Sequence, residues 1–473
     1  MGGTDIAPEA SRRGLVMDSN DGDFEFVAQR FNGTLSKVDR YRVRSHVMRA
    51  VGAARRKTGD VTSATPIPPP SLSLSGVEVS VRSIGLDPMD LSALSSITLG
   101  PVVSTILQSE PNRLKQILLC RQPSYFSFIA PRFGHFPALD NAFRCLVTVA
   151  HSKLVPNRKR SDSVILGYYG KALRSLQAAV DDPIDRYAAE TLCAASILAV
   201  FELFNLRSEQ LWGSHMAGVS RLIQLRGPAR FGSEFEQALL LKLAYPILMH
   251  SMFCNIECVL DTPAWAKVFT DAIDPLETFT DRSPLGISIM LAGIKIPGLR
   301  KRCIHAVSIR AADDELDALA AEMHSLRSYI ITWRRDFNMA LMRALDVEKY
   351  TYTKNQNRCL DKRYDLLGIY SIVYITLSRL LICITSNGRA LIEDEVQGQA
   401  LELKQLYQSV REGTKGSSYD PINYRTEFVL SQQVLAANRA IATHADFRSA
   451  VGSGRIIDPN IMMKYFTILG KKK

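Results

Sequence analysis

The chain has 473 residues, of which 46% are hydrophobic and 22% are charged. This composition is ordinary for a folded globular protein and excludes wholesale disorder. The eight cysteines are scattered through apolar helical patterns and no signal peptide precedes them, so we expect a reducing intracellular compartment.

The net charge of +11 is concentrated near the N-terminus. Residues 36–57 hold eight basic residues against one acid, or +7, which leaves only +4 for the remainder. A helix over residues 38–57 would be basic and amphipathic. Its candidate functional residues are Arg42, Arg44, Arg49, Arg55, Arg56 and Lys57. Three interpretations stay open: a nuclear localisation signal centred on residues 55–57, an electrostatic contact with nucleic acid or anionic lipid, and a solvated surface helix.

Composition divides the chain into three parts. Residues 1–91 are predicted to form a disordered N-terminal region, which contains the basic segment 36–57 and a linker rich in Pro, Ser and Thr at 58–76. Helical patterns then fill residues 92–450. Residues 451–473 show little pattern and are predicted to be a tail.

Three helix-length patterns with short connections lie between residues 163 and 228. The first has one apolar stripe. The second, at 188–204, is apolar nearly all round, so it is expected to be a core helix that other helices cover. The third carries Trp212, Met216, Val219 and Ile223 on one face and should end at Gly227-Pro228, where glycine can adopt a positive φ and proline cannot continue the helix.

More helices follow toward the C-terminus. We predict a helix over 235–252 interrupted at Pro246, an extended loop at 262–284, and a long scaffold helix over 311–345. Residues 366–385 are long and apolar enough for a membrane span, but Arg379 favours a buried helix instead. Two further helices, 391–410 and 428–444, flank a loop at 413–418. The predicted class is all-α, a helical array with a disordered basic N-terminal arm.

Several short motifs in this helical region resemble one known family. They are Tyr168-Tyr169-Gly170-Lys171-Ala172-Leu173-Arg174-Ser175-Leu176-Gln177, Phe201-Glu202-Leu203-Phe204, His215-Met216-Ala217-Gly218-Val219 and Leu222-Ile223-Gln224-Leu225-Arg226-Gly227-Pro228. Together they are similar to the regulatory domain of fungal-specific transcription factors, which usually accompanies a binuclear zinc cluster. The likeness is good over residues 120–260 and looser to about 450.

No residue pattern indicates a metal site, a cofactor site or a catalytic site. A binuclear zinc cluster needs six cysteines in two C-x-x-C-x6-C blocks, and this sequence contains no C-x-x-C. Cys254 and Cys258 are expected to be buried neighbours one helical turn apart, and His215 to be a structural residue that hydrogen-bonds across a helix packing. Glu202 is expected to be buried and paired with Arg221 or Arg226.

The resemblance implies transcriptional regulation in a fungal nucleus, with the helical body binding a protein partner, a small effector or another copy of itself. The protein would act without its own zinc-cluster DNA reader, or a coding segment upstream of Met1 would supply one. The alternative is a cytosolic helical interaction or ligand-binding module that has lost the transcriptional role. Neither hypothesis requires an enzyme, a cofactor or a membrane, and direct DNA binding is not expected.

Overall fold

The computed structural model describes residues 88–96, 124–154, 162–205, 209–350, 357–416, 421–450 and 454–466. Within these ranges every regular element is a helix and none is a strand, so the predicted all-α class is confirmed. The basic segment 36–57 and the linker 58–76 lie outside the described residues.

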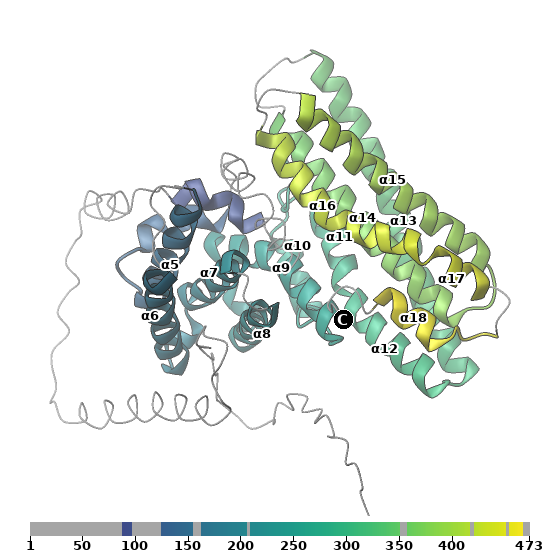
Figure 1. Ribbon diagram of the computed structural model, residues 1–473, viewed down its shortest axis with the longest axis horizontal. Coiled ribbons are helices and arrows are strands. Elements are labelled where there is room, and N and C mark those ends of the chain that lie inside the picture. The colour runs from purple at the N-terminus through teal and green to yellow at the C-terminus, as the bar shows by residue number, and fades with distance from the viewer. Residues whose placement is uncertain are drawn as a thin grey trace, which may run out of the picture.

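The first helices form a lobe at the left of Figure 1. Its elements are η1 (Pro88–Ser96), η2 (Tyr125–Phe128), η3 (Ala130–Arg132), α5 (Pro137–Leu154), α6 (Asp162–Asp181), η5 (Asp185–Tyr187), α7 (Ala189–Asn205) and α8 (Glu209–Arg226). Helix α7 packs against α5, α8 and α9. Its side chains Ile197, Leu198 and Phe201 are fully buried, which confirms the predicted core helix.

Helix α8 ends at the predicted Gly227-Pro228. Gly227 has a φ of 68°, which a residue with a Cβ adopts only with strain. The next element, η6 (Pro228–Arg230), starts at the proline. This turn directs the chain into the middle of the molecule.

Four helices occupy that middle part: α9 (Glu234–Cys254), α10 (Pro263–Asp271), α11 (Pro284–Ile294) and α12 (Ile296–Ile309). The predicted interruption at Pro246 is wrong, because α9 continues through it. A proline inside a helix costs about 3 kcal/mol, but its neighbours Tyr245 and Ile247 are both buried, and their packing offsets that cost.

The predicted loop at 262–284 is wrong in its first half. Thr262 caps α10 by accepting a hydrogen bond from the Trp265 amide, and Pro263 stands at the first helical position, where its missing N–H costs nothing. Trp265 and Phe269 are buried and hold this short helix against the body. A capping threonine followed by proline was the local signal for it.

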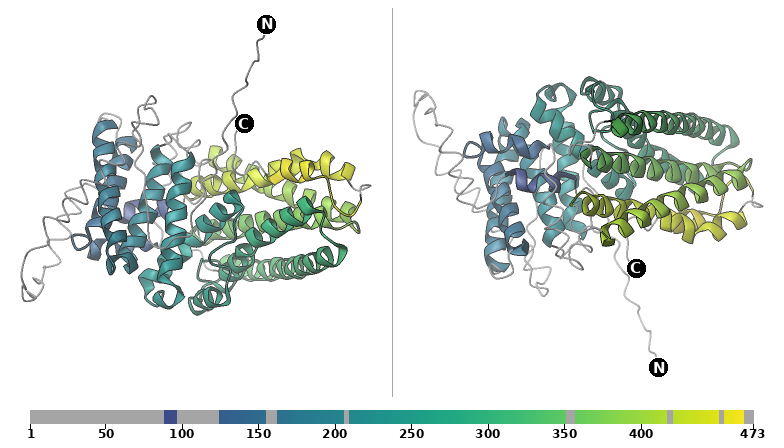
Figure 2. Two further views of the ribbon diagram at one scale, coloured as in Figure 1. Left: turned by 90° about the horizontal axis from the view of Figure 1, so that it is seen from below. Right: turned by 90° about the horizontal axis from the view of Figure 1, so that it is seen from above.

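The C-terminal half is a bundle of long helices that run alongside one another, as Figure 2 shows. It consists of α13 (Asp313–Tyr350), α14 (Asn357–Ile384), α15 (Arg389–Gly416), α16 (Pro421–Ala442), α17 (His444–Ser449) and α18 (Pro459–Phe466). Helix α14 packs against α11, α12, α13, α15 and α16 and is therefore the centre of the bundle.

Two described helices have the length and apolar character of a membrane span. They are α9 and the part of α14 from Lys362 to Ile384, and 67% and 83% of their apolar windows are buried inside the protein. The prediction of a buried helix over residues 366–385 agrees with this packing.

The predicted unpatterned tail differs from the structure where residues 454–466 are described. Helix α18 buries Met462, Tyr465 and Phe466, and the Ile457 amide donates a hydrogen bond of 3.0 Å to the Cys383 carbonyl. Eight residues are too few for a strong sequence pattern, so only tertiary packing revealed this helix.

Candidate functional site

The long helix α13 is held in place by its inward face. Trp333 and Phe337 are buried, and their rings stack with centroids 5.2 Å apart. The indole Nε1 of Trp333 donates a hydrogen bond of 2.9 Å to the Leu285 carbonyl at the start of α11. These contacts fix which residues of α13 point outward.

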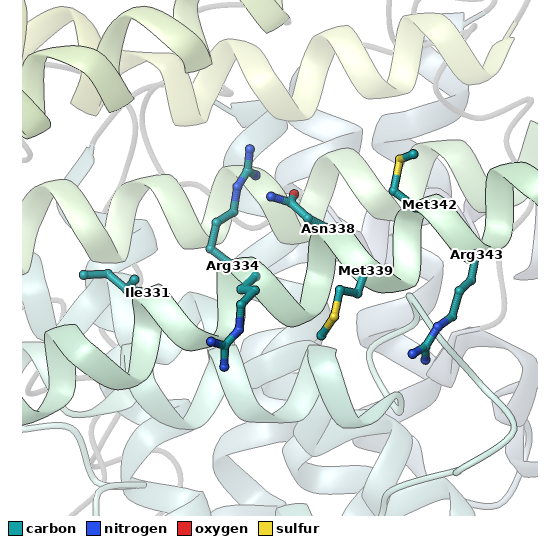
Figure 3. A pocket seen from close by; sticks show the side chains of 7 residues that line it. Ile331, Arg334, Asn338, Met339, Met342 and Arg343 are labelled. Carbon is teal, nitrogen blue, oxygen red and sulfur yellow. The ribbon is translucent and has the colours of Figure 1, made fainter.

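The outward face of α13 carries an open groove of about 520 Å³, the α13 groove. Its described lining comes from α13 alone: Ile331, Arg334, Arg335, Asn338, Met339, Met342 and Arg343. Figure 3 shows these side chains along one stretch of the helix; in this view Met339 and Arg343 point down and Met342 points up.

Large apolar side chains in the α13 groove are unusually exposed. Ile331 is 44% exposed, Met339 46% and Met342 62%. Single exposed apolar residues are common, but three close together on one helix face are typical of an interaction site. Unbranched methionine side chains can also adapt to the shape of a partner.

The groove is cationic as well as apolar. Arg335 and Arg343 are exposed, whereas Arg334 reaches back to α15 and forms an ion pair with Glu402. The described lining includes three arginines and no acid. An apolar surface edged by positive charge suits a partner that combines apolar and acidic side chains.

The second candidate is a buried polar cluster between α6, α7 and α8. The Tyr169 hydroxyl and His215 Nε2 are 3.0 Å apart, and Glu202 Oε1 lies 3.6 Å from the same nitrogen. Burial raises the pKa of the Tyr169 hydroxyl, and the Glu202 charge adds to this shift. His215 therefore hydrogen-bonds across the helix packing, as predicted.

The predicted arginine partner of Glu202 is wrong. Arg221 donates to Gln224 on its own helix, and Arg226 is paired with Glu236 of α9. The sequence shows which side chains carry opposite charge, but it does not show which helices pack together. It therefore could not reveal that His215 of α8 would face Glu202.

A third polar cluster joins α14, α15 and α17. Arg379 Nη2 donates to Glu393 Oε1 at 2.9 Å, and His444 Nδ1 lies 2.8 Å from the same oxygen. The Arg379 guanidinium also lies 3.8 Å from the ring centroid of Phe447. Burial lowers the pKa of Arg379, and the Glu393 charge opposes that shift. Since the side chains of Arg379 and Glu393 are shielded from solvent, this ion pair stabilises the bundle.

Cys258 and Cys383 are buried thiols. Burial raises the pKa of Cys258 to about 11 and that of Cys383 to about 12, so both thiols stay protonated near neutral pH. Among the described residues, no group of three or more His, Cys, Asp or Glu side chains could hold an ion.

The expectation that Cys254 and Cys258 are buried neighbours one helical turn apart is wrong. Cys254 is exposed at the end of α9, whereas Cys258 is buried beyond it. Asn255, with a φ of 53°, ends the helix between them. The spacing of the two cysteines does not show that a residue with a positive φ ends the helix between them.

The candidate residues predicted from sequence, Arg42, Arg44, Arg49, Arg55, Arg56 and Lys57, all lie outside the described residues. The α13 groove was missed, although the sequence holds a signal for it. Met342 follows Trp333 by nine residues, which at about 100° per residue places it on the opposite side of the helix. The sequence therefore contained the signal for a second apolar stripe, on the side of α13 opposite the buried one.

One part of the chain matches a known family. Residues 135–294 match the family model described as the fungal specific transcription factor domain. The matched segment extends from the start of α5 to the end of α11. Over these residues the chain is similar to the fungal specific transcription factor domain, and the resemblance noted in its sequence is confirmed.

One known protein resembles part of this chain. The chain is similar to uncharacterized protein AN5342 of Emericella nidulans, with 26% identity over 239 residues. The match covers 48% of this chain and 50% of that protein, so the chain matches about half of the relative's length. No solved structure matches the chain.

Proposed function

We propose that this protein regulates transcription in a fungal nucleus through its helical body, which binds a protein partner at the α13 groove. The observation that carries the proposal is the transcription factor domain over residues 135–294. The exposed Ile331, Met339 and Met342 on α13 support the binding role. This role requires neither catalytic turnover nor a cofactor.

Promoter selection would then come through the protein partner that binds the α13 groove. The basic segment 36–57 would direct the protein to the nucleus, where a regulator has to work. Arg55, Arg56 and Lys57 form its densest cluster.

A tethering experiment tests the regulatory role. The full chain is fused to an unrelated DNA-binding module in a fungal host, and the output of a reporter gene is compared with that of the module alone. We expect the fusion to change the output, and the pair Met339→Asp and Met342→Asp to abolish that change, because carboxylates would enter an apolar contact.

The matched control is Leu391→Asp, which charges a side chain of α15 that is 65% exposed and lies outside the groove. Thermal melting of each purified variant verifies that it folds. An inactive fusion of normal abundance, or equal loss with the groove pair and the control, would refute partner binding at α13.

Localisation separates this proposal from a cytosolic binding module. A fluorescent tag on the full chain should accumulate in nuclei, and changing Arg55, Arg56 and Lys57 to alanine should shift it toward the cytoplasm. A wild-type chain that stays cytoplasmic would favour the cytosolic module instead.

A further inference from the structure

The chemistry of the α13 groove specifies what it can bind. Its described lining combines three apolar side chains, three arginines and one asparagine. Within residues 331–343 there are three arginines and one acid, Asp336, which gives a net charge of +2. A complementary ligand needs several acids together with large apolar side chains.

One stretch of the same chain has this composition. Residues 17–27 contain the acids Asp18, Asp21, Asp23 and Glu25, and no Lys or Arg occurs between residues 14 and 29. The apolar side chains Met17, Phe24, Phe26 and Val27 are interspersed with these acids. Mixed acidic and aromatic segments of this type bind apolar, basic surfaces.

We propose that the α13 groove binds residues 17–27 of its own chain. The two aromatic rings cover Met339 and Met342, and the carboxylates face Arg335 and Arg343. Sulfur–aromatic contacts and ion pairs at the edge of an apolar contact are each favourable.

The covalent connection permits this contact. Residue 27 precedes the first described residue, Pro88, by 88 − 27 = 61 residues. At about 3.3 to 3.6 Å per residue, the connection can span up to roughly 200 Å. Helix α13, with 38 residues, is only about 57 Å long at 1.5 Å per residue. The connection can thus span several times the length of this helix, so chain length does not prevent the contact.

Two other occupants fit the groove less well. A second copy that presented the same face would bring like charges together, with Arg335 and Arg343 opposed to arginines. Nucleic acid would satisfy the arginines, but Ile331, Met339 and Met342 would gain no apolar contact from phosphates. An acidic and aromatic peptide satisfies both kinds of side chain.

Photocrosslinking in the full chain tests the proposal. Met342→p-benzoylphenylalanine places a photoreactive group in the groove, and mass spectrometry identifies the peptides that it captures. We expect capture of residues 17–27 within the same chain. The matched control, Leu391→p-benzoylphenylalanine, puts the same group on exposed α15 and should not capture them.

Charge exchange supplies the sharper test. Arg335→Glu with Arg343→Glu should lower the captured yield about fivefold or more, since two ion pairs become repulsive. Adding Asp23→Lys and Glu25→Lys should restore it. Both arginines are exposed, so these changes remove little packing, and thermal melting verifies folding.

Other outcomes would overturn the proposal: capture of residues 36–57, capture of a second copy, capture of a co-purified protein alone, or a yield that ignores the charge exchange. The inference uses the same α13 groove as the proposed function, so residues 17–27 and a protein partner would compete for it and bind there in turn. The contact with residues 17–27 does not depend on regulation. If the reporter output stayed unchanged while residues 17–27 were still captured, the proposed function would be refuted and this contact would stand.

Discussion

Arg379 and Glu393 form an ion pair that solvent does not reach, in the centre of the C-terminal bundle. Their side chains are 0% and 1% exposed. A second acceptor, the Ala440 carbonyl, takes a hydrogen bond of 2.9 Å from the same guanidinium nitrogen. Charges placed in such an environment are tolerated only when their partners are present. This pair therefore fixes how α14, α15 and α16 fit together.

Arg379→Met should lower the free energy of unfolding by about 3 to 5 kcal/mol, because it leaves the Glu393 carboxylate buried without its cation. The matched control is Arg448→Met. Arg448 pairs with Asp394 between α17 and α15, but these side chains are 48% and 57% exposed, so the cost should stay below about 1 kcal/mol. Urea unfolding followed by circular dichroism measures both. Equal losses would contradict the role assigned to the buried pair.

At the scale of a helix, α9 shows how local signals and packing combine. Ser233 Oγ accepts from the Glu236 amide at 3.3 Å, and a Glu236 carboxylate oxygen accepts from the Ser233 amide at 3.1 Å, which together form a capping box. Farther along, Pro246 has no backbone N–H, so one backbone hydrogen bond of the helix is missing there. The helix forms because its start is capped and its middle is buried.

Ser233→Ala should cost about 1 kcal/mol of stability, since it exposes an unpaired amide at the start of α9. Ser308→Ala on α12 is the control, because this hydroxyl is exposed and bonds only to the Ile304 carbonyl of its own helix. Its effect should remain within about 0.5 kcal/mol. Thermal melting of the two variants compares them. A melting point unchanged by Ser233→Ala would show that the cap contributes nothing.

At the scale of the whole molecule, α18 connects the C-terminal end to the middle helices. Tyr465 and Phe466 are buried, and the Arg300 guanidinium of α12 lies 5.5 Å from the ring centroid of Phe466. Figure 1 shows α18 beside α12 at the lower edge of the bundle. The last described helix therefore belongs to the core and not to a tail.

Phe466→Ala should lower the stability of the full chain by about 3 to 5 kcal/mol, because it opens a cavity where α18 meets α12. Asn460→Ala, on the exposed side of α18, should be nearly neutral. Denaturant unfolding measures the difference. If Phe466→Ala were as mild as the control, the packing of α18 would be dispensable.

The amino-acid sequence was enough to predict the helical class, the core helix α7, the end of α8 at Gly227-Pro228, and the resemblance of residues 120–260 to a fungal-specific transcription factor domain. These features depend on apolar periodicity and on local backbone preferences, which neighbouring residues along the chain define. Such signals can be interpreted without knowing which helices touch.

The identity of the buried charges that meet and of the apolar faces that stay exposed became known only from the packing of the helices. Glu202 approaches His215 instead of an arginine, Pro246 is accommodated within α9, and α18 packs into the core. The same packing buries Trp333 and leaves Met342 open to solvent. Each outcome depends on residues that are distant in sequence, because burial and pairing are properties of the assembled helices and not of any one of them.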